Sequence, residues 1–143
     1  MVLNPDIWLP RFQFIMQTIS INYPMTPNDV TKKKYYDFIQ NLPLLLPEKP
    51  MGSTFLKMLD EYPVTPYLSS RESFMKWTHF INNKFNKIMD WNSLSFRESL
   101  EKYYELYKPD SVKKQELYKE RKKYIQLGFL ISGIGVTYYL YTK

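Results

Sequence analysis

Helix start and stop signals recur along the first 109 residues of this 143-residue chain, and strand signals do not. Prolines or short turns separate stretches in which apolar residues repeat at the spacing of an α-helix. The pattern predicts an all-α protein. The expected helices cover residues 10–22, 28–42 (capped by Asn28 or Thr26), 53–61, 69–89 and 95–107, with a further basic helix from Asp110.

Two capping boxes mark predicted helix starts. Ser69 precedes Glu72, and Ser95 precedes Glu98, at the three-residue spacing that lets each pair satisfy two free backbone N–H groups. The first box opens the most strongly amphipathic stretch of the chain, with Trp77 on its apolar face. This helix is expected to pack into the core of the domain.

The residue types present exclude several kinds of chemistry. Aromatic residues make up 17% of the chain, enough for a packed core, but there is no cysteine. Disulfides, thiolate metal sites and thiol nucleophiles are therefore excluded. His79 is the single histidine, with no nucleophile or orienting acid beside it, so a partly packed imidazole is favoured over a general base and no metal site is expected.

The formal net charge of +6 is concentrated beside an uncharged run. Six cations precede this run: Lys113, Lys114, Lys119, Arg121, Lys122 and Lys123. This placement favours acidic lipid as the partner and makes nucleic acid a weaker hypothesis, although Lys32–Lys34 beside two tyrosines leaves that alternative open.

The uncharged run covers residues 124–141 and spans roughly 27 Å as a helix, close to the thickness of a thin bilayer. Tyrosines lie at both of its ends. We therefore predict a transmembrane anchor over 124–142, a basic juxtamembrane helix over 110–123 and a helical domain over 1–109 that stays on the cytosolic side. The alternative is an apolar helix that docks on the domain. Within the span, small residues spaced four apart either form a homodimerisation face or are present only because small residues are common in membrane helices.

Several segments occur in the order found in one enzyme family. They are Trp8–Ile19, Asn22–Pro24, Tyr36–Leu42, Leu46–Pro47, Leu68–Phe74 and Trp77–Asn86. This order resembles that of the Erv/ALR-type FAD-linked sulfhydryl (thiol) oxidases, and in particular that of the small oxidases of large DNA viruses. The resemblance implies a compact bundle of four or five helices that cradles FAD and often dimerises.

The chain departs from this family at the residues that carry the chemistry. Where the resemblance places the redox Cys-x-x-Cys, Glu48 and Met51 stand, and neither can form a disulfide or a thiolate next to flavin. The resemblance also assigns the FAD contacts. The corresponding residues are Gln13 and Gln17, in place of an aromatic and an imidazole, followed by Asn82, Asn83, Phe85 and Asn86.

Asp90 is a further departure, since the resemblance puts a cation near the cofactor's phosphates at this point and a carboxylate would repel them. The old flavin groove is either open or filled by side chains, and Phe12, Phe14 and Phe85 are the candidates to fill it.

The sequence therefore predicts a redox-inactive, membrane-anchored relative of the thiol oxidases, not an enzyme, that acts as a scaffold or virion-assembly component through protein contacts. A homodimer or an active thiol oxidase paralogue is the expected protein partner, and a viral inner membrane or a host endomembrane is the expected location. No cofactor is expected. The alternative is an FAD-binding subunit whose cysteines come from a partner.

Overall fold

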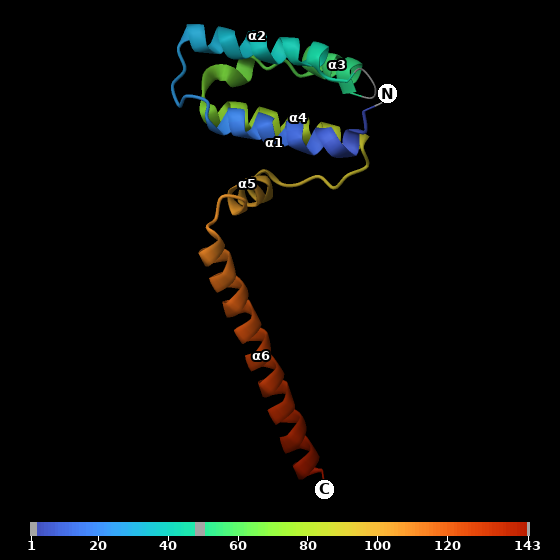
Figure 1. Cartoon of the computed structure of the whole chain (residues 1–143), viewed down its shortest axis with the longest axis vertical. Coiled ribbons are helices and arrows are strands. Elements are labelled where there is room, and N and C mark those ends of the chain that lie inside the picture. The colour runs from blue at the N-terminus through green and yellow to red at the C-terminus, as the bar shows by residue number, and fades with distance from the viewer. Residues whose placement is uncertain (1–2, 48–50, 143) are drawn as a thin grey trace. The chain divides into compact units, whose positions relative to one another are not determined.

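The computed structural model describes residues 3–47 and 51–142, and it is helical throughout, with no strand in those two ranges (Figure 1). The elements are α1 (Pro5–Ile21), α2 (Asp29–Leu45), α3 (Ser53–Glu61), the short 3-10 helix η2 (Thr65–Ser69), α4 (Arg71–Ile88), α5 (Phe96–Glu105) and α6 (Asp110–Tyr141). The all-α prediction is confirmed.

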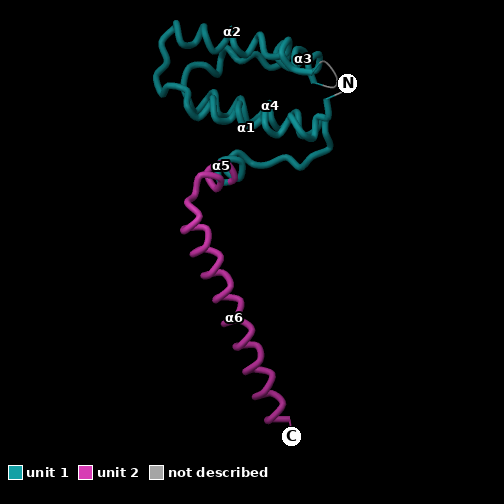
Figure 2. Tube along the Cα trace, in the orientation of Figure 1, with its two compact units in different colours: residues 1–101 teal, residues 102–143 magenta. Residues whose placement is uncertain are grey.

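The chain divides into two compact units, Met1–Glu101 and Lys102–Lys143, which Figure 2 shows in different colours. The first unit contains α1 to α4 and the start of α5, and the second contains the rest of α5 and the whole of α6. The predicted domain boundaries at 109 and 123 remain predictions.

Side-chain caps explain most of the helix starts. Asn4 accepts a hydrogen bond from the Asp6 backbone N–H at 2.9 Å, and Asn28 accepts one from the Thr31 N–H at 2.8 Å. The Ser95–Glu98 capping box is present: the Glu98 N–H donates to Ser95 Oγ at 3.2 Å, and the Ser95 N–H donates to Glu98 Oε2 at 2.8 Å. These local contacts are the reason that a sequence pattern can locate a helix start.

Some predicted helix ends are wrong. Pro10 lies inside α1, where Pro5 takes the first-turn position, and Pro43 lies inside α2 rather than ending it. Pro43 is buried within the core, and its position near the end of α2 limits the loss to a single backbone hydrogen bond. The cap of α4 is Ser70, not Ser69, because Ser69 belongs to η2, which the sequence pattern did not predict.

The core of the first unit lies between α1 and α4, which run side by side in opposite directions, and α2, α3 and η2, which cover them (Figure 1). Trp77 of α4 is almost fully buried, stacks on Phe74 and donates from its indole N–H to the Tyr62 carbonyl at 3.0 Å. Tyr23 is fully buried and donates to the Leu68 carbonyl at 2.9 Å. Both polar groups are satisfied, so these large rings fill the core without an unpaired donor.

The second unit corrects the prediction of a membrane span. As predicted, α6 runs without a break from the basic stretch into the uncharged one. However, among the described residues no helix combines the length and the apolarity needed to cross a membrane, so the transmembrane helix over 124–142 and the single-pass topology are not supported. The reason is composition: Gln126, the glycines and four tyrosines dilute the apolar side chains of the run.

Candidate functional site

Gln13 of α1 bridges to α4. Its side-chain Nε2 donates to the Asn82 carbonyl oxygen at 3.2 Å and to Asn86 Oδ1 at 2.8 Å. All three residues are partly buried and are residues that the family resemblance assigns to the cofactor. The amide group that stands in place of the family's aromatic ring therefore links the two helices that would flank a ligand.

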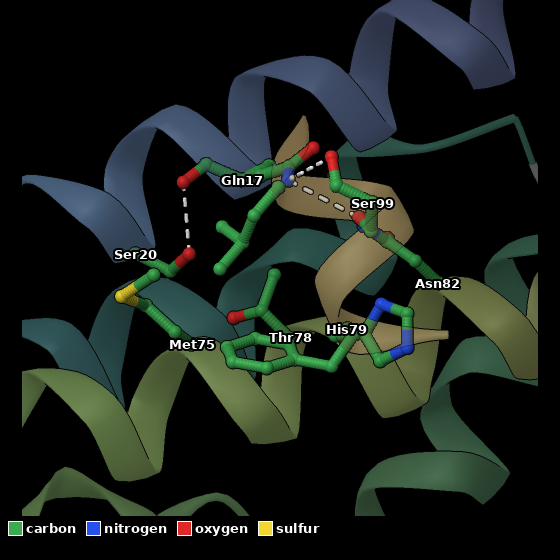
Figure 3. A pocket seen from close by; sticks show the side chains of 9 residues that line it. Gln17, Ser20, Met75, Thr78, His79, Asn82 and Ser99 are labelled. Carbon is green, nitrogen blue, oxygen red and sulfur yellow. Dashed lines mark hydrogen bonds between the residues drawn. The ribbon is translucent and has the colours of Figure 1, made fainter. Parts of the chain in front are cut away.

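Gln17, one helical turn further along α1, makes the corresponding bridge to α5. Its Nε2 lies 3.2 Å from the Ser99 carbonyl oxygen and 3.2 Å from Ser99 Oγ, and both can accept its hydrogens. Figure 3 shows the Gln17 side chain directed at Ser99, and both residues line a small cavity. The two glutamines therefore connect α1 to α4 and to α5 by side-chain hydrogen bonds.

Asn83 and Asn86 hold the segment that follows α4. Asn83 makes a two-way contact with the Leu94 peptide: Nδ2 donates to the carbonyl at 2.8 Å, and Oδ1 accepts from the N–H at 3.3 Å. Asn86 Nδ2 donates to the Asn92 carbonyl at 3.4 Å. In this chain the two asparagines that the family pattern retains stabilise a loop by satisfying its backbone groups.

Phe85 is fully buried and contacts two other rings. Its ring centroid lies 5.2 Å from that of Phe55 and 6.2 Å from that of Phe12, with both pairs edge to face. Phe12 and Phe85 therefore pack in the interior of the first unit, while their filling of a flavin groove stays a prediction. Phe14, the third candidate, is 37% exposed and does not belong to this core cluster.

Met51 and Glu48 are the residues that the resemblance places at the positions of the family's redox cysteines. Met51 is fully buried and belongs to the core cluster of the first unit. Glu48 lies outside the described residues. A thioether cannot exchange disulfides with a substrate thiol, so Met51 serves as core packing at a position where the family carries out redox chemistry.

The cavity in Figure 3 is very small. The volume open to the centre of a water-sized sphere inside it is about 10 Å³, which is close to the minimum for one water molecule. Sites for drug-sized ligands enclose roughly 300–1,000 Å³. Thr78 lines it, is 2% exposed, and its Oγ1 finds no hydrogen-bond partner in the described part of the chain. The lining residues are Gln17, Ser20, Met75, Thr78, His79, Asn82, Phe96, Ser99 and Leu100.

The backbone conformation of Asp90 suits its place directly after the end of α4. Its φ of 57° is left-handed, and it directly follows the C-cap residue Met89 of α4. The Asp90 N–H donates to the Lys87 carbonyl at 3.3 Å, and the Trp91 N–H donates to the Asn86 carbonyl at 2.8 Å. This pattern is a Schellman helix end, a position usually taken by glycine. Its backbone role is to end α4, and the predicted repulsion of phosphates remains untested.

His79 lines the small cavity of Figure 3 and is held in its neutral form. The Leu94 peptide fixes the amide of Asn83 so that its Nδ2 points at His79 Nε2, 3.0 Å away. Because the Asn83 amide donates this hydrogen bond, His79 Nε2 must be its acceptor. Burial lowers the pKa of His79 below its ordinary value of 6.5, and a hydrogen bond involving the Leu94 backbone offsets part of this shift.

The lowered pKa of His79 predicts a loss of stability in mild acid. As the pH falls below about 6.5, the unfolded chain takes up a proton more readily than the folded chain does. The free energy of unfolding should be highest above this pH and should decrease until the pH passes the lowered pKa. Urea unfolding at pH values between about 7.5 and about 5.5 measures this slope. In a His79→Gln variant the slope should flatten, and an unchanged slope would contradict the assignment.

The sequence analysis did not identify Ser99, Asn92 or Leu94. Ser99 directly follows the Ser95–Glu98 capping box, so the box places it in the first turn of α5, but nothing in the sequence pairs it with Gln17. Among the described residues, no group of three or more histidine or acidic side chains is placed to hold a metal ion.

Comparisons with known proteins agree with this geometry. No protein-family model matches the chain. It is 29% identical over 100 residues to a probable FAD-linked sulfhydryl oxidase of Acanthamoeba polyphaga mimivirus, covering 69% of this chain and 70% of the relative. Its structure is similar to the yeast Erv1 core (TM-score 0.63, 19% identity, 74% of this chain and 85% of that one). It is also similar to the FAD-binding domain of Saccharomyces cerevisiae Erv1 (TM-score 0.61, 20% identity, 66% and 89%).

In fold and in sequence the chain is similar to the Erv/ALR-type FAD-linked sulfhydryl oxidases, and it contains no cysteine. The resemblance predicted from the order of motifs is confirmed. Within this class the sequence match is to a viral protein, and the solved structures share the fold at low identity.

Proposed function

We propose that this protein is a redox-inactive, thiol-oxidase-like scaffold that acts through protein contacts, with virion assembly in a large DNA virus as its setting. The observation that carries the proposal is the pair of bridges by which Gln13 and Gln17, the residues that the resemblance assigns to the cofactor, join α1 to α4 and α5. The viral source of the sequence relative supports the setting.

The chemistry of the chain supports the loss of activity. Thiol oxidation by this family needs a cysteine pair that passes electrons to flavin, and this chain has no cysteine. Met51 is buried in the core at one of the two corresponding positions. The proposed partners are proteins: a second copy of the chain or an active thiol oxidase paralogue.

The arrangement of the groove between α1, α4 and α5 in this structure argues against FAD binding. Its amides are already paired with Asn82, Asn86 and Ser99, and the cavity beside Thr78 has space for about one water molecule. An isoalloxazine ring would have to displace these bridges. We therefore propose that the protein binds no flavin.

The second candidate function is an FAD-binding subunit that receives its cysteines from a partner. The observation in its favour is the similarity to the FAD-binding domain of yeast Erv1, which extends over 66% of this chain. This hypothesis requires the α1–α4–α5 groove to open when flavin is present.

A visible absorption spectrum distinguishes the two functions. The full chain is purified, measured, then mixed with excess FAD and separated from free FAD, beside an active flavin-binding member of the family as control. We expect a colourless protein that retains no flavin. Flavin absorption that co-purifies, or that saturates at one FAD per chain, would overturn the scaffold proposal and favour the subunit hypothesis.

A further inference from the structure

Nearly all of the formal charge lies in the second unit. Residues 102–143 contain nine lysines and arginines against four acidic residues, whereas residues 1–101 contain eleven against ten. Six of the cations lie in α6 between Lys113 and Lys123. The positive charge of α6 therefore attracts anionic surfaces.

The other half of α6 is apolar and uncovered. No residue of α6 is buried. The aliphatic and phenylalanine side chains of this half are each more than half exposed: Ile125, Leu127, Phe129, Leu130, Ile131, Ile134, Val136 and Leu140. At 100° per residue they occupy two opposite sides of the helix, so one flat protein surface cannot cover them all.

The polar groups in this half are already satisfied inside the helix. Ser132 Oγ donates to the Gly128 carbonyl at 2.8 Å, and Thr137 Oγ1 donates to the Gly133 carbonyl at 3.0 Å. Moving these hydroxyls out of water therefore leaves neither without an acceptor. Unpaired donors are what makes apolar surroundings costly for serine and threonine, and this helix avoids that penalty.

We infer that α6 binds a membrane surface rich in anionic lipid. Its basic half, residues 113–123, lies among the headgroups, and its apolar half, residues 125–140, contacts the acyl chains of the same leaflet without crossing the bilayer. The charge and the apolar surface are separated along the helix, which is the separation that an interface between headgroups and acyl chains requires. Nucleic acid would match the charge but would leave the apolar half in water. This inference goes beyond the proposed function and does not depend on whether FAD binds.

Vesicle flotation of the full chain tests the inference. The vesicles are phosphatidylcholine alone or phosphatidylcholine mixed with phosphatidylserine. We expect binding to the mixed vesicles and much weaker binding to the neutral ones. Each lysine near an anionic surface contributes about 1 kcal/mol, so a Lys119→Gln/Lys122→Gln variant should bind roughly 25-fold more weakly. The matched control, Lys76→Gln/Lys87→Gln in the first unit, should bind as the unchanged protein does.

A second variant tests the apolar half. Ile131→Ser/Ile134→Ser should abolish flotation with both kinds of vesicle, while far-UV circular dichroism shows that the helix content is retained. If helix content falls, Ile131→Ala/Ile134→Ala, which keeps a strong helix former at both positions, replaces it with the same expectation. Equal binding to neutral and anionic vesicles would overturn the inference. So would binding to duplex DNA that exceeds binding to vesicles and is unaffected by the isoleucine substitutions.

Discussion

Replacing Phe85 by alanine is expected to lower the free energy of unfolding of the first unit by about 3–5 kcal/mol. Phe85 is fully buried between Phe12 and Phe55, so truncation removes a ring from the centre of an aromatic cluster and leaves a cavity. Urea unfolding followed by tryptophan fluorescence measures the loss. All three tryptophans lie within residues 1–101, so this signal reports on the first unit alone.

Phe14→Ala is the matched control for this prediction. It makes the same chemical change in α1, but the Phe14 side chain is exposed and lies outside the core cluster. Its effect should be roughly 0.5–1 kcal/mol at most. If Phe85→Ala were tolerated as well as Phe14→Ala, the interior would not be packed in the way the structure shows, and the prediction that these rings fill a flavin groove would lose its support.

Restoring the family's residue types at the two bridges should not restore flavin binding. In a Gln13→Trp/Gln17→His variant, the bonds to Asn82, Asn86 and Ser99 are lost or altered, and a larger ring replaces the partly buried Gln13 amide between α1 and α4. Overpacking of this kind costs about 1–3 kcal/mol, and the polar groups left unpaired add to that loss. Urea unfolding and the visible spectrum with excess FAD are the two measurements.

A Gln13→Ala/Gln17→Ala variant separates the two causes, because it removes the same hydrogen bonds without adding volume. We expect it to lose about 1–3 kcal/mol through the unpaired groups. The opposite outcome is also informative: a Gln13→Trp/Gln17→His protein that is as stable as the unchanged chain and turns yellow with FAD would show an adaptable groove. That result would favour the FAD-binding subunit.

Local signals in the sequence predicted the helices because their causes are local. The Asn28 cap and the Ser95–Glu98 box work through hydrogen bonds that reach three residues along the chain, so the pattern contains all the partners. Pro10 and Pro43 were misjudged for the opposite reason. Whether a helix continues through a proline depends on the packing that surrounds it, as the buried position of Pro43 shows.

The candidate site was likewise predicted only in part: the sequence identified its residues but not their contacts. The order of motifs identified Gln13, Gln17, Asn82 and Asn86 as the residues at the family's cofactor positions. It did not show what these residues contact, because Gln13 and Asn86 are 73 residues apart and Gln17 and Ser99 are 82 apart. An amide can face solvent, a ligand or another amide, and only the approach of α1, α4 and α5 selects among these.

By itself the sequence determined the helical class, the similarity to the thiol oxidases in the order of motifs and the absence of cysteine, because these depend on residue identity and order along the chain. The tertiary structure decided that Phe12 and Phe85 pack in the interior while Phe14 is exposed, and that the two glutamines of α1 bond to α4 and α5. These outcomes depend on side chains from distant segments competing for the same small volume, and that competition is resolved only when the helices pack together.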